Sequence, residues 1–167
     1  MASHPPSTLR NLIIAMVAIS LTVLLFLGIR GQSGRPSLAT LAAQAIPYEV
    51  AQGNGKPSLV EFYADWCTTC QAMATTMDQL RQHYGDQINF VMLNVDNHKW
   101  LPEMVQYQVD GIPHFLYLDS AGELLASAIG EQPRQILADN LLALQSQLPL
   151  PHQQTLVGQR SPTQNSS

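Results

Sequence analysis

An uncharged apolar run near the N-terminus constrains what this chain can fold into more than any other feature. The run, LIIAMVAISLTVLLFLGI at positions 12–29, is 18 residues long, and only Ser20 and Thr22 in it are polar. The hydrocarbon core of a bilayer takes roughly 17–25 apolar residues as a helix. In lipid a helix satisfies its own backbone groups, and Ser and Thr bond back to the preceding turn. The sequence therefore predicts a transmembrane anchor at 12–29.

A cleaved signal peptide is the alternative interpretation of this run. A signal peptide has an apolar region of about 7–15 residues, followed closely by small residues. Here Arg30 follows the run at once, and the nearest A-x-A pattern, at 43–45, lies far downstream. These features favour an uncleaved anchor. Its orientation stays open, because Arg10 lies on one side of the run and Arg30 and Arg35 on the other.

The rest of the chain divides by composition. We expect an N-terminal cap at 1–11, a polar tether at 30–37, one domain at 38–148 and a disordered tail at 149–167, which is rich in Pro, Gln and Ser. From residue 36 onward there are 12 acidic and 5 basic residues, so this part has a net charge of −7. That balance argues against binding to nucleic acid, which needs a basic face.

The middle of the chain alternates between strand and helix signals. Four apolar stretches predict strands at 58–64, 88–95, 114–118 and 124–129. Helical patterns predict a short helix at 38–45, one from the cysteines to Tyr84, one around 102–108 and one at 133–147. We therefore expect an α/β fold with a central mixed sheet of about four to five strands flanked by helices.

The two cysteines lie in the segment WCTTC, at Cys67 and Cys70, where the first predicted strand gives way to a helix. A spacing of three places both sulfurs on one face of the first helical turn. The free N–H groups and the dipole at the helix N-terminus lower the pKa of the Cys67 thiol, and the thiolate is the nucleophile. A second thiol beside it can resolve a mixed disulfide. The pattern indicates a redox-active dithiol.

The cysteine pair has three other possible interpretations. The pair could be half of a zinc site, but the sequence has no second cysteine pair. No histidine has the spacing of a zinc ligand relative to Cys67 and Cys70. Haem attachment needs a histidine at 71, which is Gln71. Two buried structural cysteines stay open on the motif alone. We accordingly expect neither a metal nor a cofactor.

The segments VEFYADWCTTC (60–70) and GIPHF (111–115) resemble the thioredoxin family, and the resemblance spans residues 46–147. It implies the thioredoxin fold and a cis Pro113 that faces the two cysteines. It also implies that the backbone of Ile112 pairs with the substrate peptide. Without the cysteines, Pro113 would be taken for an ordinary turn residue.

Glu61 lies inside the first predicted strand, between two apolar residues. Burial would raise the pKa of its carboxyl group, which could then take a proton from Cys70 and return it. Thioredoxins carry an acid at the matching position, usually Asp; the alternative is that Glu61 reaches the surface. Two departures from the family pattern stand nearby: Met92 replaces a common Lys, and Thr68-Thr69 replaces Gly-Pro.

Two more residues were candidates for substrate binding. His114 follows Pro113, where thioredoxins commonly have Thr. It could hydrogen-bond to Cys67 or, when protonated, lower the pKa of that thiol; the alternative is a packing role. Trp66 could shape the docking surface beside the cysteines or simply belong to the core.

The segments FVMLNVDNHKW (90–100) and GIPHFLYLD (111–119), with the anchor, are similar to the membrane-anchored TxlA-type thioredoxin-like proteins of cyanobacteria. Their plant relative sits in the thylakoid membrane with its redox domain in the lumen. The resemblance implies a single-pass protein of the thylakoid or plasma membrane that reduces disulfides of lumenal or periplasmic proteins. It implies apocytochromes as clients, a role in cytochrome maturation and assembly, and a CcdA-type membrane thiol transporter as electron donor.

Two alternative functions remain at this point. One is a membrane-bound assembly module that holds clients, with redox chemistry secondary. The other is a disulfide-forming oxidant, since the same two cysteines can run the reaction in either direction.

Overall fold

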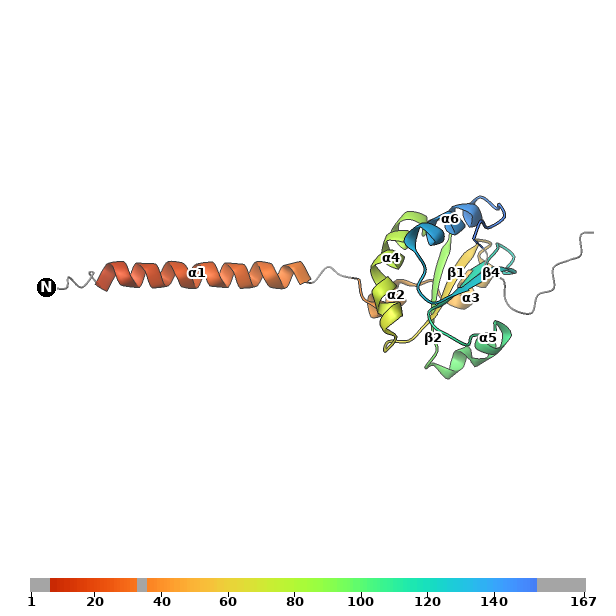
Figure 1. Cartoon of the computed structure of the whole chain (residues 1–167), viewed down its shortest axis with the longest axis horizontal. Helices are drawn as coiled ribbons and strands as arrows, with labels where there is room; N and C mark the ends of the chain where they lie inside the picture. The colour runs from red at the N-terminus through yellow and green to blue at the C-terminus, as the bar shows by residue number, and fades with distance from the viewer. Residues whose placement is uncertain (1–6, 33–35, 153–167) are drawn as a thin grey trace, which may run out of the picture. The chain divides into compact units, whose positions relative to one another are not determined.

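The computed structural model describes residues 7–32 and 36–152 (Figure 1). The chain divides into two compact units, residues 1–35 and residues 36–167, and each is considered by itself. The expected cap at 1–11 falls largely outside the described residues, as do the middle of the expected tether and residues 153–167.

The first unit contains one helix, α1, at Ser7–Gln32. Its stretch Thr8–Phe26 is long and apolar enough to cross a membrane, which makes it a candidate span by length and composition. The hydroxyl of Ser20 donates to the carbonyl of Met16 at 2.8 Å, and that of Thr22 to Ala18 at 2.7 Å. Both polar side chains in the run are thus satisfied within the helix, as expected. The helix continues three residues past position 29, into the expected tether.

The second unit is built on a four-strand mixed sheet of order β2-β1-β3-β4. The strands are β1 (Ser58–Tyr63), β2 (Asn89–Asn94), β3 (His114–Leu118) and β4 (Leu124–Ile129). β1 pairs in parallel with β2 and antiparallel with β3, and β3 pairs antiparallel with β4. Every residue of the central strand β1 is buried, because both faces of the sheet are covered. Predicted and observed strands agree within a residue or so at each end.

Helices cover the two faces of the sheet unequally (Figure 1). Core side chains of α2 (Leu38–Gln44), α4 (Thr68–Tyr84) and α6 (Arg134–Gln145) pack with Leu59, Tyr63 and Phe115 on one face, which we call the cysteine face because Cys67 and Cys70 belong to it. On the opposite face, α3 (Tyr48–Gly53), the 3-10 turn η1 (His98–Trp100) and α5 (Leu101–Gln106) cover Val60, Phe62 and Leu116.

Local chemistry accounts for the start of α2 and the end of α4. Ser37 caps α2, and its hydroxyl accepts the N–H of Thr40 at 3.2 Å. Gly85 ends α4 with a right-handed φ of −63°, whereas a glycine that ends a helix usually takes a left-handed conformation. The position excludes larger residues because a Cβ there would lie 2.5 Å from the carbonyl oxygen of Arg81.

Two features of this unit were not predicted. The helix α3 has only six residues, too short for an apolar period to show in the sequence, although it buries Tyr48 and Ala51. The domain also continues past position 148. Leu150 is buried, and the main chain of His152 donates to and accepts from the side-chain amide of Asn140, at 3.0 and 2.8 Å. The first four residues of the expected tail therefore belong to the folded unit.

Candidate redox site

Cys67 and Cys70 lie where β1 gives way to α4, as the sequence predicts, and are joined by a disulfide. Cys67 is the N-cap of the 17-residue helix α4, and its Sγ accepts the backbone N–H of Cys70 at 3.1 Å. Cys67 is 6% exposed and Cys70 is 0% exposed. An approaching molecule therefore reaches the Cys67 sulfur first, and that sulfur lies at the positive end of the helix dipole.

Glu61 is fully buried in the middle of β1, opposite Met92 on β2 and Phe115 on β3. Because side chains alternate along a strand, it points to the cysteine face with Leu59 and Tyr63. Neither carboxyl oxygen has a hydrogen-bond partner in the described part of the chain. Burial raises the pKa of this carboxyl group to about 8. The interpretation in which Glu61 reaches the surface is thereby excluded.

The peptide bond between Ile112 and Pro113 is cis. Pro113 comes just before β3, whose first residue, His114, pairs with Phe62 near the end of β1. The cis bond therefore lies at the same end of the sheet as the cysteines, since β3 runs antiparallel to β1. The carbonyl oxygen of Pro113 accepts the N–H of Gly130 at 2.8 Å, which ties the turn to the end of β4.

Trp66 is 65% exposed, so the core interpretation of this residue is wrong. Its indole Nε1–H donates to Oδ2 of Asp96 at 3.0 Å. Sequence reasoning missed Asp96. The sequence does contain a signal for it. Asp96 comes two residues after β2, and Asp65 comes two residues after β1. Because β1 and β2 are parallel neighbours, their carboxyl ends meet at one edge of the sheet, which brings the two residues to the same edge.

His114 lies on the other face of the sheet. It is directly opposite Phe62, with ring centroids 6.3 Å apart in an edge arrangement, and Phe62 belongs to the core opposite the cysteine face. His114 is 0% exposed, and neither ring nitrogen has a hydrogen-bond partner among the described residues. Burial lowers the pKa of His114, which disfavours the protonated ring. The expected hydrogen bond to Cys67 is not formed, and the geometry favours the packing interpretation.

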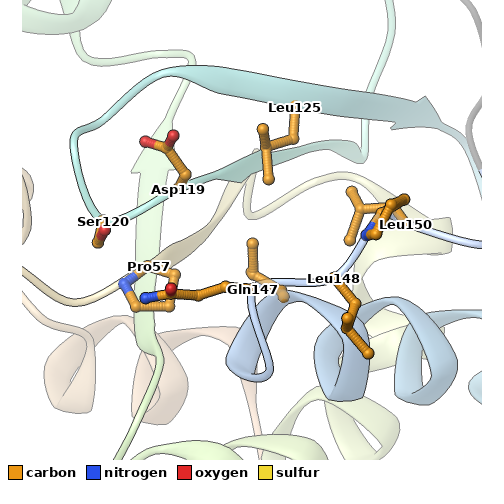
Figure 2. Close-up of a pocket in the computed structure, with 9 residues that line it drawn as sticks. Pro57, Asp119, Ser120, Leu125, Gln147, Leu148 and Leu150 are labelled. Carbon is orange, nitrogen blue, oxygen red and sulfur yellow. The ribbon is translucent and has the colours of Figure 1, made fainter.

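A separate pocket of about 370 Å³ lies at the other end of the sheet. Figure 2 shows Leu125, Leu148 and Leu150 around it, with Asp119 and Pro57 at its rim. Pro57 precedes β1 and Cys67 follows it, so the strand of six residues, about 20 Å long, separates the pocket from the cysteines. The reactive sulfurs do not line this pocket, and it is not the redox site. Within 7–32 and 36–152 no group of three or more His, Cys, Asp or Glu side chains is placed to hold a metal.

Comparison with known proteins places the chain. Residues 37–143 match the thioredoxin family. The chain is 50% identical over 160 residues to the thiol:disulfide interchange protein TxlA homolog of Synechocystis sp., which covers 96% of this chain and 88% of that protein. It is 55% identical over 147 residues to TxlA of Synechococcus elongatus, covering 88% and 77%.

A solved structure gives the same fold. The germline-specific thioredoxin Deadhead of Drosophila melanogaster is 28% identical, with a TM-score of 0.50 over 57% of this chain and 86% of that one. The mixed sheet, the cysteine pair and the similar proteins all point to the same family. The chain therefore belongs to the thioredoxin family, within it to the TxlA-type thiol:disulfide interchange proteins, and it is a thiol–disulfide oxidoreductase with the thioredoxin fold.

Proposed function

We propose that this protein is a membrane-anchored reductant of protein disulfides, in which Cys67 attacks, Cys70 resolves and Glu61 carries the proton. One observation carries the proposal. The more accessible sulfur, that of Cys67, caps the N-terminus of α4, while Cys70 and the unpaired carboxyl group of Glu61 are buried on the same face of the sheet.

The first step uses the reduced protein. The Cys70 N–H and the helix dipole stabilise the Cys67 thiolate. This thiolate attacks one sulfur of a client disulfide, forms a mixed disulfide with the client and releases the other client sulfur as a thiolate. The backbone of Ile112, next to the cis Pro113, pairs with the client peptide during this step, and Trp66 provides the docking surface.

The second step resolves the mixed disulfide. Glu61 accepts the proton of the Cys70 thiol, and the resulting thiolate attacks Sγ of Cys67. The client leaves as its second thiolate, and the protein keeps the disulfide between Cys67 and Cys70. Two electrons have passed to the client. A dithiol donor must then return two electrons, and Glu61 returns its proton to Cys70, before the next turnover.

The anchor and the resemblance to TxlA-type proteins support a proposal for the location of the protein, its clients and its electron donor. The candidate span in α1 would hold the redox unit at a membrane, and we assign this unit to the lumen of a thylakoid or to the periplasm. Clients would include apocytochromes during cytochrome maturation and assembly, and a membrane thiol transporter of the CcdA type would supply electrons. The printed names of the relatives, thiol:disulfide interchange proteins, support the exchange reaction.

Cysteine variants of the full chain in detergent test the mechanism. Cys67→Ser should abolish reduction of a disulfide client, while Cys70→Ser should accumulate a mixed disulfide that a non-reducing gel detects. Unchanged turnover in Cys67→Ser would contradict the mechanism. The double variant, returned to a deletion strain, tests the assembly-module alternative, because a module that only holds its clients would still restore growth.

The direction of electron flow needs a separate measurement, the reduction potential of the cysteine pair. Thioredoxin lies near −270 mV and the oxidant DsbA near −120 mV. We expect a value close to the first. A value close to the second would make the protein a disulfide-forming oxidant and remove the need for a CcdA-type donor.

A further inference from the structure

Trp66, the residue before the attacking Cys67, is exposed to solvent; its indole donates to Asp96, and Asp65 precedes it in the chain. We propose that this surface, Trp66 with Asp65 and Asp96, binds a Lys or Arg side chain of the client close to the cysteine that is attacked. The inference rests on the proposed function and deepens it, because it names the class of disulfide that the protein prefers.

The surface is held in place by a chain of hydrogen bonds. The Trp66 indole donates to Asp96 at 3.0 Å, and the backbone N–H of Asp96 donates to Oδ1 of Asn94 at 2.9 Å. The amide nitrogen of Asn94 donates in turn to Oδ2 of Asp65 at 3.3 Å. Asn94, the last residue of β2, thereby links the loops that follow the two parallel strands. Asp96 is fixed against the indole, and Asp65, the residue before Trp66, is held by the same chain of hydrogen bonds before any client arrives.

The negative charges of these carboxylates are left uncompensated. The donors to Asp65 and Asp96 are an amide and an indole, both neutral. Three of the bases within residues 36–152 are engaged elsewhere: Lys56 donates to a backbone carbonyl, Arg81 pairs with Asp78 and Lys99 pairs with Glu49. Arg134 pairs with neither carboxylate in the described part of the chain. Among residues 36–152 no base is left to pair with these two carboxylates, so we assign the cation to the client.

Elsewhere in residues 36–152 an indole ring and a carboxylate already bind a lysine side chain. The Nζ atom of Lys99 lies 4.3 Å from the centroid of the Trp100 ring and 2.6 Å from Oε1 of Glu49. An ammonium group over an indole with a carboxylate beside it is a favourable arrangement, since the ring face and the carboxylate both attract the cation. At Trp66 the ring and the carboxylates are present, and the cation is the part that a client would bring.

The position of the surface turns this attraction into specificity. Trp66 precedes Cys67, so a cation held on its ring belongs to the client segment within a few residues of the attacked sulfur. A client with Glu at that place would meet two negative charges. We therefore expect the rate of the first exchange step to depend on the charge beside the client cysteine.

Three synthetic peptides test the inference. Each contains one cysteine bound as a mixed disulfide to thionitrobenzoate, and they differ only in a neighbouring Arg, Gln or Glu. The reduced full chain in detergent attacks the peptide sulfur and releases thionitrobenzoate, which absorbance follows. At low ionic strength we expect the Arg peptide to react about three to ten times faster than the Gln peptide, and the Glu peptide to be slowest. The ratio should fall toward one near 1 M salt, where the Debye length is about 3 Å.

Variants separate the surface from general charge. Asp65→Asn and Trp66→Leu should each bring the Arg-to-Gln ratio close to one. Glu123→Gln removes one charge from the exposed turn at the opposite end of the sheet and should keep the ratio of the wild type. Equal rates for all three peptides, or an equal loss in Glu123→Gln, would overturn the inference and leave the proposed function intact. Failure of the wild type to react with any peptide would overturn the proposed function itself.

Discussion

The parallel strands β1 and β2 each bury a polar side chain, and the surroundings of these two side chains are opposite in kind. Near the far end, the Asn89 amide nitrogen lies within hydrogen-bond distance of Ala51 O, Asn54 Oδ1, Lys56 O and Ser58 Oγ, and its oxygen accepts from Asn54 at 2.8 Å. Toward the redox end, the carboxyl group of Glu61 has no hydrogen-bond partner among the described residues. Both side chains are almost wholly removed from water.

The difference distinguishes a buried polar group that stabilises the fold from one that is available for proton transfer. A buried amide with several partners repays its desolvation and fixes the loop at 54–57 against the sheet. An unpaired buried carboxyl group is costly, and burial raises its pKa to about 8, so that it can both gain and lose a proton near neutral pH. Such a group is poorly suited to hold the fold together and well suited to move a proton.

The largest effect is expected for Glu61→Gln in the resolving step. The amide cannot accept the Cys70 proton, so release of the second client thiolate should slow by about 10²–10³-fold. The first step, attack by Cys67, should change far less. Rapid-mixing kinetics with a client disulfide separates the two steps. Glu61→Asp, which keeps a carboxyl group, should recover much of the rate; equal slowing of both steps would contradict the proton-transfer role.

Asn89→Ala should give the next largest effect, on stability. Removing the amide leaves several buried groups unpaired at once, so the free energy of unfolding should fall by about 2–4 kcal/mol. Urea unfolding of the oxidised protein measures it. Asn54→Ala, which removes a partner at the surface end of the same network, should cost less. The rate of exchange per folded molecule should not change in either variant, and a loss of exchange in Asn89→Ala would break the contrast.

The pH dependence of stability gives a third test of Glu61. Its pKa is about 8 in the folded protein and about 4.5 when the chain is unfolded, so the folded state binds more protons between these values. The free energy of unfolding should therefore fall as pH rises from 4.5 to 8, by up to about 1.4 kcal/mol per pH unit. Glu61→Gln should flatten this slope. Identical slopes in the two proteins would mean that burial does not hold the proton on Glu61.

Much of this site was predictable because strand-forming stretches and the cysteine pair are local signals. The predicted ends of β3 and β4 match the structure. The run SLVEFYA by itself predicts a buried strand that contains Glu61, and the structure has this strand. The resemblance to thioredoxins, not a local pattern, supplied the cis bond at Pro113. The raised pKa of Glu61 follows from the same reasoning that predicted it, namely desolvation without a partner.

The parts that were missed depend on contacts between distant residues. Asp96 holds Trp66 across 30 positions of sequence, and Asn140 holds the main chain of His152 through its side chain. No periodicity reports such contacts. The side of the sheet that His114 faces was also undetermined, because a one-residue change of register would reverse it. The observed pairing with Phe62 sends its ring away from the cysteines.

His114→Leu should have the smallest effect and decides between the two roles considered for this residue. The ring is buried against Phe62 with both nitrogens unpaired, so an apolar side chain of similar size should leave the free energy of unfolding within about 1 kcal/mol at neutral pH. Burial lowers the pKa of His114, so the unfolded chain takes up the proton first as pH falls below 6.5, and the wild type loses stability there. The variant should not show that loss, and its rate of disulfide exchange should match the wild type. A fall in that rate at unchanged stability would instead mean that His114 acts on Cys67 through the sheet, and the packing interpretation would have to be given up.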